Sequence, residues 1–145
     1  MMIPQTGSFK IGFDTVLISR IDQSLSRWGT AFTNRLFTER EQAYCDTGVG
    51  PVRASRYAVR FAAKEAFVKA WDLFYWNAPP PLQGICFSAI EVVSDRWGRP
   101  KLELLGSVGE TFETLGFSVE SVSLSHDNTN ACAVVGVALK KQGQI

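Results

Sequence analysis

The first half of the chain shows a hydrophobic pattern that predicts one strand followed by several helices. The apolar segment Lys10–Ile21 predicts a strand that carries one acid, Asp14, in its middle. The mixed segment Asp22–Tyr44 predicts two or three short helices. Within it, Thr38 and Glu41 have the spacing of a capping box, so we expect one helix to begin there.

The longest helix is predicted between Val52 and Tyr75, directly after a break at Gly48–Pro51. This segment contains neither glycine nor proline, and it is rich in alanine, arginine and lysine, which favour helix. The segment Asn77–Pro81 contains three consecutive prolines and must end the helix, because proline lacks the backbone N–H that a helix interior needs.

The second half of the chain predicts paired antiparallel strands and one short helix. The predicted elements are the strand Phe87–Ser94, the turn Asp95–Pro100, the strand Lys101–Leu105, the helix Val108–Leu115 ending at Gly116, and the strands Val119–Ser125 and Ala131–Leu139 joined by the polar turn His126–Asn130. The pattern therefore predicts one α+β domain over residues 1–145. We expect a small antiparallel sheet packed against one long helix and several short helices.

Composition narrows the classes of protein. Hydrophobic residues make up 46% of the chain and charged residues 20%, which excludes an intrinsically disordered protein. The 15 Lys and Arg nearly balance the 14 Asp and Glu and leave a net charge of +1. Domains that bind nucleic acid usually carry a clear basic excess, so we expect no nucleic-acid partner. Any anion site must come from local clustering of cations.

Cysteine usage and the apolar runs indicate a cytoplasmic protein. Cys45, Cys86 and Cys132 lie far apart, are odd in number and lack zinc-ligand spacing, which favours a reducing compartment. The segment Met1–Lys10 has no apolar core typical of a signal peptide. The longest apolar run, Ala131–Leu139, is too short to span a bilayer, so we expect no membrane association.

The long predicted helix carries four charged residues that could form a site. Helical spacing places Arg60 and Lys64 on one line and Glu65 and Lys69 on the adjacent line. Alanines around them would allow close approach by a ligand or by another element. From spacing alone we favour an ordinary solvated face, with a Glu65–Lys69 pair that contributes about 0.3–0.5 kcal/mol.

Asp14 and His126 each allow two interpretations. An acid within an apolar strand is costly to bury unless it is paired or binds a metal, but Asp14 could equally lie on a polar edge. A strand carboxylate together with a helix carboxylate would suit Mg²⁺, which takes its remaining oxygens from water and phosphate. The alternation of side chains along a strand would place His126 on the same face as Val122 and Leu124. It is either a structural hydrogen-bond partner or a phosphate contact at the end of the strand.

Four segments in this order resemble the holo-acyl-carrier-protein synthase family, the small 4′-phosphopantetheinyl transferases. They are IGFDTVLISRI, RFAAKEAFVKAW, GRPKLEL and SVSLSHD, and the resemblance runs from about Ile11 to Leu139. The helix motif together with the S-x-S-H strand is specific for this family, whereas the G-x-D motif alone is common to many proteins. The resemblance implies the α+β fold of that family. It also implies a homotrimer with active sites at the subunit interfaces.

The resemblance also implies roles for individual residues. Asp14 and Glu65 would bind Mg²⁺, and Lys69 would lie near the diphosphate of coenzyme A and assist proton transfer. Arg60 and Lys64 would contact coenzyme A phosphates. The remaining implied contacts are His126 with the adenosine 3′-phosphate end, and Arg20 and Arg35 with the carrier protein. Arg20, Arg35 and two other arginines of the N-terminal helices, Arg27 and Arg40, either form a basic strip or simply solubilise the surface.

The implied reaction moves the 4′-phosphopantetheine arm of coenzyme A to a serine of apo-acyl carrier protein and releases adenosine 3′,5′-bisphosphate. Either Glu65 or a water on the metal would take the serine proton. Two other classes of protein are weaker alternatives. A non-catalytic module that binds coenzyme A or a carrier protein is disfavoured because Asp14, Glu65 and Lys69 are all present. A nucleic-acid binder that uses Arg53, Arg56, Arg60 and Lys64 is disfavoured by the net charge of +1.

Two segments depart from the family pattern. Trp71–Pro81 is bulky and proline-rich where members carry a Gly-Thr-Gly-like turn, and Met1–Ser8 is an extension. Seven apolar residues exceed what one small sheet obviously needs, so they either support the trimer or fill the core of a single chain: Phe61, Phe67, Trp71, Phe74, Val134, Val135 and Val137.

Overall fold

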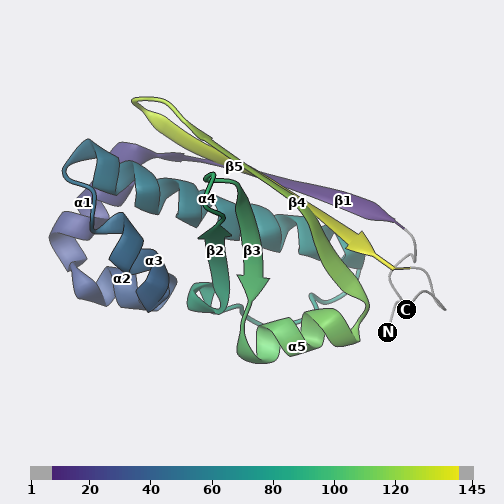
Figure 1. Cartoon of the computed structure of the whole chain (residues 1–145). Helices are drawn as coiled ribbons and strands as arrows, with labels where there is room; N and C mark the ends of the chain where they lie inside the picture. The colour runs from purple at the N-terminus through teal and green to yellow at the C-terminus, as the bar shows by residue number, and fades with distance from the viewer. Residues whose placement is uncertain (1–7, 141–145) are drawn as a thin grey trace.

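The computed structural model describes residues 8–140, and most of the Met1–Ser8 extension lies outside that range. Figure 1 shows the arrangement of the elements. In chain order they are β1 (Phe9–Leu17), α1 (Ile18–Trp28), α2 (Thr30–Leu36), α3 (Glu39–Cys45), α4 (Pro51–Asp72), β2 (Ile90–Ser94), β3 (Pro100–Leu104), α5 (Gly106–Thr114), β4 (Phe117–His126) and β5 (Asn130–Leu139). Short 3₁₀ turns at Leu73–Tyr75 and Phe87–Ala89 complete the fold.

The sheets confirm the predicted α+β architecture. A three-stranded antiparallel sheet has the order β1-β5-β4, and β2 and β3 form a separate antiparallel hairpin. The long helix α4 runs beneath the three-stranded sheet, with α1–α3 gathered at one end and the hairpin and α5 on the other side of α4 (Figure 1). No helix among residues 8–140 is long and apolar enough to cross a membrane.

The first strand is shorter than its sequence predicts. The predicted strand extended to Ile21, whereas β1 ends at Leu17 and the chain continues directly into α1. Three buried residues recur at helical spacing: Ile18, Ile21 and Leu25. A helix places all three on one buried face, whereas a strand would turn some of them toward solvent. The capping box is confirmed: the Thr38 hydroxyl accepts from the Glu41 backbone N–H, and the Glu41 carboxylate accepts from the Thr38 backbone N–H.

Gly12 brings β1 into direct contact with the backbone of α4. A Cβ atom at this position would lie 1.8 Å from the Ala66 carbonyl oxygen and 2.7 Å from the Ala70 nitrogen. Only glycine permits so close an approach. Because side chains alternate along a strand, Asp14 lies on the same face of β1 as Gly12 and is held against α4.

The apolar residues that could have supported a trimer mostly belong to the core of one chain. Phe67, Trp71, Phe74, Val135 and Val137 are buried within a single copy, so they fill the core of a single chain and give the trimer no support. The aromatic core around Trp71 needs them, because the rings of α4, α5 and β4 pack against one another there.

A row of exposed apolar side chains lies on the outer face of the three-stranded sheet. Phe9, Ile11, Phe13 and Leu17 alternate along β1 with residues that face α4, and each is between 42% and 57% exposed. Val134 of β5 lies opposite Phe13 in the register and is 39% exposed. This sheet face is therefore one apolar surface that a single chain leaves uncovered.

Candidate active site

Asp14 and Lys69 meet where β1 crosses α4. The Lys69 Nζ donates to Asp14 Oδ1 at 3.0 Å and to the carbonyl oxygen of Phe13 at 3.1 Å. The Asp14 side chain is 15% exposed and that of Lys69 is 54% exposed, so the pair is open to solvent on the lysine side. The structure thus joins a strand acid and a helix lysine that lie 55 residues apart in the sequence.

Glu65 lies close enough to this pair to interact with both members. Burial raises the pKa of the Glu65 carboxyl, and the negative charge of Asp14 raises it further, whereas the Lys69 ammonium lowers it. Two carboxylates that repel each other beside an accessible lysine form a local charge cluster in a chain that is nearly neutral overall. We call Asp14, Glu65 and Lys69 the open cluster.

The open cluster fits a magnesium ion. Carboxylate oxygens are the ligands that Mg²⁺ prefers, and Mg²⁺ usually binds through one or two protein carboxylates, waters and substrate phosphates. Among residues 8–140 no three His, Cys, Asp or Glu side chains come together, which excludes a metal site of three such ligands in this range. The repulsion between Asp14 and Glu65 would be relieved by a cation.

Lys64, one residue before Glu65, points into the core, and this corrects the expectation that it contacts a coenzyme A phosphate. Its side chain is fully buried, and its Nζ donates to Glu41 Oε1 at 2.6 Å, to the Leu36 carbonyl at 2.6 Å and to the Phe87 carbonyl at 3.0 Å. An ammonium has three donors, and all three are used. Lys64 is therefore a structural residue in this fold.

Glu41 and Glu91 extend this buried charge group. Glu41 Oε2 accepts the Val92 backbone N–H at 2.9 Å, which ties α3 to β2. Glu91 is 2% exposed; it accepts from the Thr38 hydroxyl and pairs with Arg40 at 3.0 Å. We call Glu41, Lys64 and Glu91 the closed cluster. The capping box pointed to Glu41, but no sequence signal showed that Lys64 and Glu91 belong with it.

Arg60 faces a different side of α4 from Lys69. The two residues are nine positions apart, which at about 100° per residue places them on opposite sides of the helix. Arg60 is 7% exposed, its Nη1 donates to the Arg56 carbonyl at 3.0 Å, and its guanidinium lies 4.8 Å from the Tyr44 ring centre. Its Nε is buried and has no hydrogen-bond partner.

The other predicted site residues lie on the surface, away from the open cluster. His126 is exposed at the end of β4, and the register pairs it with Ala131, which pairs in turn with Val16. His126 is thus two strands from β1, about 10 Å across the sheet. Arg20 on α1 and Arg35 on α2 are both exposed.

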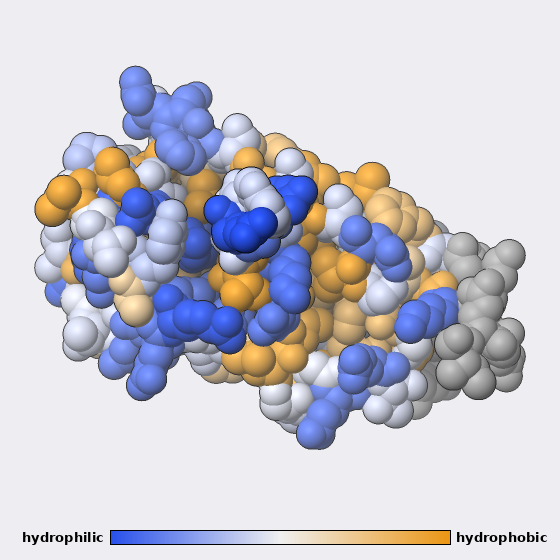
Figure 2. All heavy atoms as spheres, viewed as in Figure 1, coloured by the Kyte–Doolittle hydropathy of each residue, from blue (hydrophilic) through white to orange (hydrophobic). Residues whose placement is uncertain are grey.

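A cleft of about 560 Å³ adjoins Lys69, between β1 and the segment that follows α4. Asp72, the last residue of α4, also borders it, and sequence reasoning missed this acid. A larger cleft of about 780 Å³ lies elsewhere, between β3, α5 and β4. It is on the face drawn in Figure 2, where hydrophobic residues gather across the middle, and the open cluster contributes nothing to it.

Comparisons with known proteins show the family of the chain. A family model described as the 4′-phosphopantetheinyl transferase superfamily matches residues 10–135. A holo-[acyl-carrier-protein] synthase from Geobacter metallireducens is 41% identical over 128 residues, which cover 88% of this chain and 94% of the relative. Another from Nocardia farcinica is 39% identical over 126 residues, which cover 86% of this chain and 83% of the relative.

A solved structure of an ACPS–CoA complex from Chronobacterium ammoniagenes matches with a TM-score of 0.84 and 33% identity, covering 92% of this chain and 99% of that one. The chain belongs to the 4′-phosphopantetheinyl transferase superfamily. Within it, the resemblance to holo-acyl-carrier-protein synthases that the sequence motifs indicated is confirmed, and so is the transferase class of enzyme.

Proposed function

We propose that the protein transfers 4′-phosphopantetheine from coenzyme A to a serine of apo-acyl carrier protein, at a site built on the open cluster. The observation that supports this most is the meeting of Asp14, Glu65 and Lys69 where β1 crosses α4. These three residues come from two of the four segments that carry the family resemblance. Adenosine 3′,5′-bisphosphate is the second product.

Asp14 and Glu65 would hold Mg²⁺ in this proposal. When bound, the ion supplies positive charge beside the diphosphate of coenzyme A, where negative charge builds up on the leaving group. Lys69 adds a fixed cation at the same place, since its ammonium is half exposed and can turn from Asp14 toward a phosphate oxygen. Phosphoryl transfer depends mainly on such positioning and charge neutralisation.

The serine hydroxyl of the carrier must lose its proton as it attacks the phosphorus. Glu65 or a water takes that proton. Lys69 keeps Asp14 and the incoming phosphate oriented, because it donates to both.

Arg60 and His126 are proposed as the residues that hold the nucleotide end of coenzyme A. Among residues 8–140 the buried Nε of Arg60 has no hydrogen-bond partner, and a phosphate oxygen would satisfy it once the side chain turns toward the ligand. His126 is exposed at the sheet edge and can reach a ligand there. Both lie away from Lys69 in one copy of the chain, on the far side of α4 or two strands away.

This separation supports a homotrimer in which each site is shared between copies. The outer face of β1 is apolar and exposed, and Phe13 on that face directly precedes Asp14. A second copy packed there would bring its own nucleotide-binding residues to the open cluster. Three copies close into a ring through such head-to-tail contacts.

Arg20 and Arg35 are proposed to contact the carrier protein. Both are exposed, on α1 and α2, so a local basic surface can steer an acidic partner even though the net charge of the chain is only +1. The sequence does not select among carrier proteins; a place in fatty-acid biosynthesis and a cytoplasmic location stay predictions.

Mass spectrometry of the carrier tests the proposal. Purified protein is incubated with a bacterial apo-acyl carrier protein, coenzyme A and Mg²⁺, and the same mixture with EDTA is the control. We expect the carrier to gain the mass of one 4′-phosphopantetheine group only when Mg²⁺ is free, with adenosine 3′,5′-bisphosphate released in equal amount. An unmodified carrier in both mixtures would contradict the proposal.

A further inference from the structure

One cation, one acid and several apolar side chains border the cleft beside Lys69. Lys69 and Asp72 lie one helical turn apart on α4, so they border the cleft as neighbours. Phe13 of β1 and Leu73 and Trp76 after α4 form much of the wall. Trp76 is 76% exposed and Leu73 is 49% exposed, so within residues 8–140 these apolar side chains are left largely uncovered.

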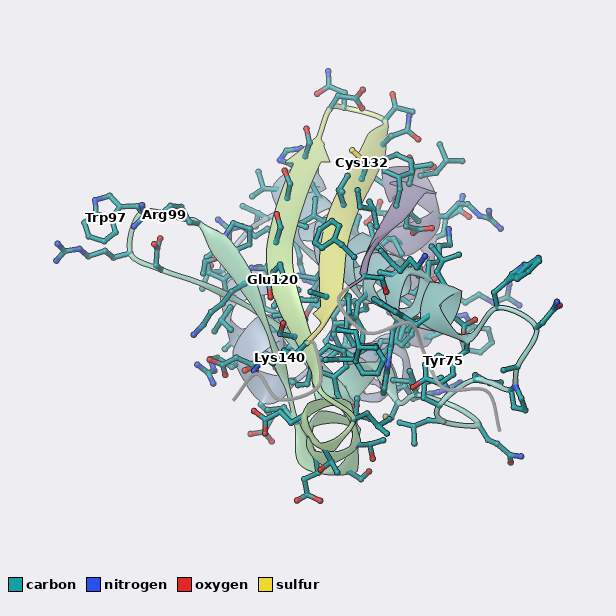
Figure 3. The ribbon with its side chains drawn as sticks, turned by 90° about the vertical axis from the view of Figure 1, so that its right-hand side faces the viewer. Tyr75, Trp97, Arg99, Glu120, Cys132 and Lys140 are labelled. Carbon is teal, nitrogen blue, oxygen red and sulfur yellow. The ribbon has the colours of Figure 1, made fainter. Side chains whose placement is uncertain are left out.

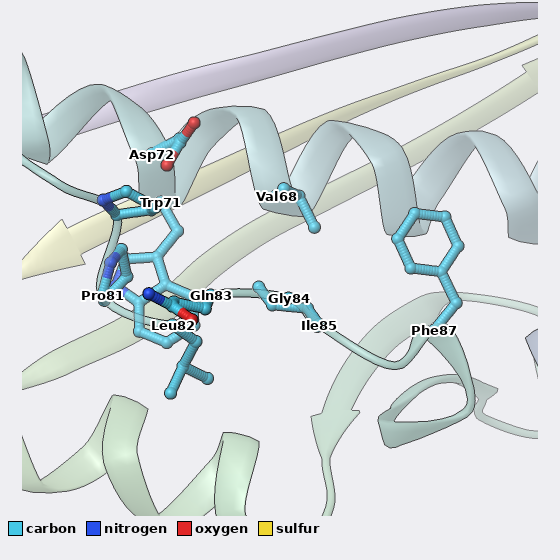
Figure 4. Close-up of a pocket in the computed structure, with 10 residues that line it drawn as sticks. Val68, Trp71, Asp72, Pro81, Leu82, Gln83, Gly84, Ile85 and Phe87 are labelled. Carbon is cyan, nitrogen blue, oxygen red and sulfur yellow. The ribbon is translucent and has the colours of Figure 1, made fainter.

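Asp72 is an acid in an unfavourable place. It is the last residue of α4, where the backbone carbonyls carry partial negative charge and an anion is disfavoured. Within residues 8–140 its carboxylate has neither an ion pair nor a hydrogen bond. Figure 4 shows this carboxylate turned away from Leu82 and Ile85, so it is not held by the segment that packs under the helix.

We infer that this cleft receives the part of the pantetheine arm next to the diphosphate, and that Asp72 fixes the arm by accepting a hydrogen bond from its hydroxyl or its first amide N–H. The inference rests on the proposed function, because it takes the diphosphate to lie at Lys69. Asp72 acts here as a positioning and specificity residue, and it takes no part in moving the phosphoryl group.

The chemistry of the arm matches the cleft. Beyond the diphosphate the arm is uncharged, carries two methyl groups on one carbon, and then a hydroxyl and an amide. The methyl groups fit an apolar wall such as Phe13, Leu73 and Trp76, and the hydroxyl and amide are donors that a carboxylate accepts. The same carboxylate repels phosphate, so we expect the diphosphate at Lys69 and the arm at Asp72, one helical turn further along α4.

The cleft lies far from Trp97, another exposed aromatic residue. Figure 3 shows Trp97 and Arg99, at the tip of the β2–β3 hairpin, on the opposite side of the molecule from Tyr75, which borders the cleft. The segment that departs from the family pattern, Trp71–Pro81, thus supplies Asp72, Leu73, Tyr75 and Trp76 to one site. The unusual residues of this segment are explained if they recognise the arm.

Calorimetric titration with two ligands tests the inference. Coenzyme A carries the arm, and adenosine 3′,5′-bisphosphate carries the nucleotide without it. The proteins are the unmodified chain, Asp72→Ala, Asp72→Asn and, as a matched control for loss of an exposed acid, Glu113→Gln on α5. We expect Asp72→Ala to weaken coenzyme A binding about tenfold, the loss expected for a hydrogen bond to a charged group, and to leave bisphosphate binding within about twofold.

Asp72→Asn keeps one acceptor oxygen, so it should restore part of the coenzyme A affinity, and Glu113→Gln should bind both ligands like the unmodified chain. The inference is overturned if Asp72→Ala binds coenzyme A normally or weakens both ligands equally. If the unmodified chain binds neither ligand, the proposed function fails and this inference fails with it. These outcomes separate an error about the arm from an error about the enzyme.

Discussion

The protein contains two clusters of the same composition, each with two carboxylates and one lysine, and they have opposite environments. In the closed cluster, Lys64 is fully buried and all its donors are used within the chain. In the open cluster, Lys69 is half exposed and donates to Asp14 and to one carbonyl. Lys64 and Glu65 are neighbours in sequence, yet they belong to different clusters.

The difference lies in what remains available to a ligand. The charges of the closed cluster are compensated inside the chain, so the cluster joins α3, α4 and β2 and offers nothing outward. The open cluster leaves two carboxylates that repel each other and a lysine in contact with solvent. The accessible, incompletely compensated group is therefore the proposed chemical site, and the group whose lysine has all its donors used within the chain is structural.

The largest effect is expected from Lys64→Met, which leaves Glu41 buried without its partner. Breaking a buried ion pair in this way costs about 3–5 kcal/mol of stability. The matched change in the open cluster, Lys69→Met, removes an exposed pair that contributes at most about 1 kcal/mol. Urea unfolding of both variants gives the two free energies of unfolding. Equal losses of stability would contradict the distinction between the clusters.

Asp14→Asn should have the opposite effect to Lys64→Met: a large loss of activity with little loss of stability. It keeps the shape of the side chain but removes one of the two carboxylates, so we expect the transfer rate to fall by about 10²–10³-fold, as when one group that stabilises transition-state charge is lost. The urea midpoint should stay close to that of the unmodified chain. A variant that keeps its rate over a Mg²⁺ titration would exclude Asp14 from the metal site.

Val134→Glu tests the shared site without touching either cluster or the cleft beside Lys69. The side chain is 39% exposed in one copy, so the fold should tolerate a charge there, whereas a packed interface between copies should not. We expect light scattering to show a shift from three copies toward the 16.0 kDa single chain, with the transfer rate falling in parallel. An active species that has the single-chain mass even without the substitution would exclude the trimer.

The smallest effect concerns the two cysteines near the clusters. Burial raises the pKa of Cys45 to about 11, with Arg60 opposing and Glu41 adding to the rise. Cys86 is exposed, and the hydrogen bond with the Ser88 hydroxyl lowers the pKa of its thiol. Iodoacetamide at about pH 8 should therefore modify Cys86 at least about tenfold faster than Cys45 in the folded protein. Peptide mapping after a timed quench gives both rates, and similar rates would show that Cys45 is accessible.

The sequence predicted local features well because their causes are local. The break before α4, the capping box at Thr38 and the two antiparallel pairs depend on residues close together in the chain. The end of β1 was predicted wrongly because an apolar run fits either a strand or the start of an amphipathic helix. Burial of Ile18 and Ile21 against α4 decides for the helix.

The candidate site was predictable only through its motifs. Helical spacing alone places Lys64 beside Glu65 without showing which of them faces the core. Which of the two faces the core depends on where the fold places Glu41 and the Phe87 carbonyl, each 23 residues from Lys64 in the sequence. Asp72 was missed for a similar reason, since its lack of a partner is visible only when all its neighbours are placed.

The most direct test of the account is the transfer reaction of Glu65→Gln beside that of Glu113→Gln. Both substitutions remove one acid, but only Glu65 belongs to the open cluster. With coenzyme A, Mg²⁺ and an apo-carrier, the rate at which the carrier gains mass should fall by about 10²–10³-fold in Glu65→Gln and stay unchanged in Glu113→Gln, at equal stability. A Glu65→Gln protein that modifies the carrier at the normal rate would contradict the assignment of the active site to the open cluster.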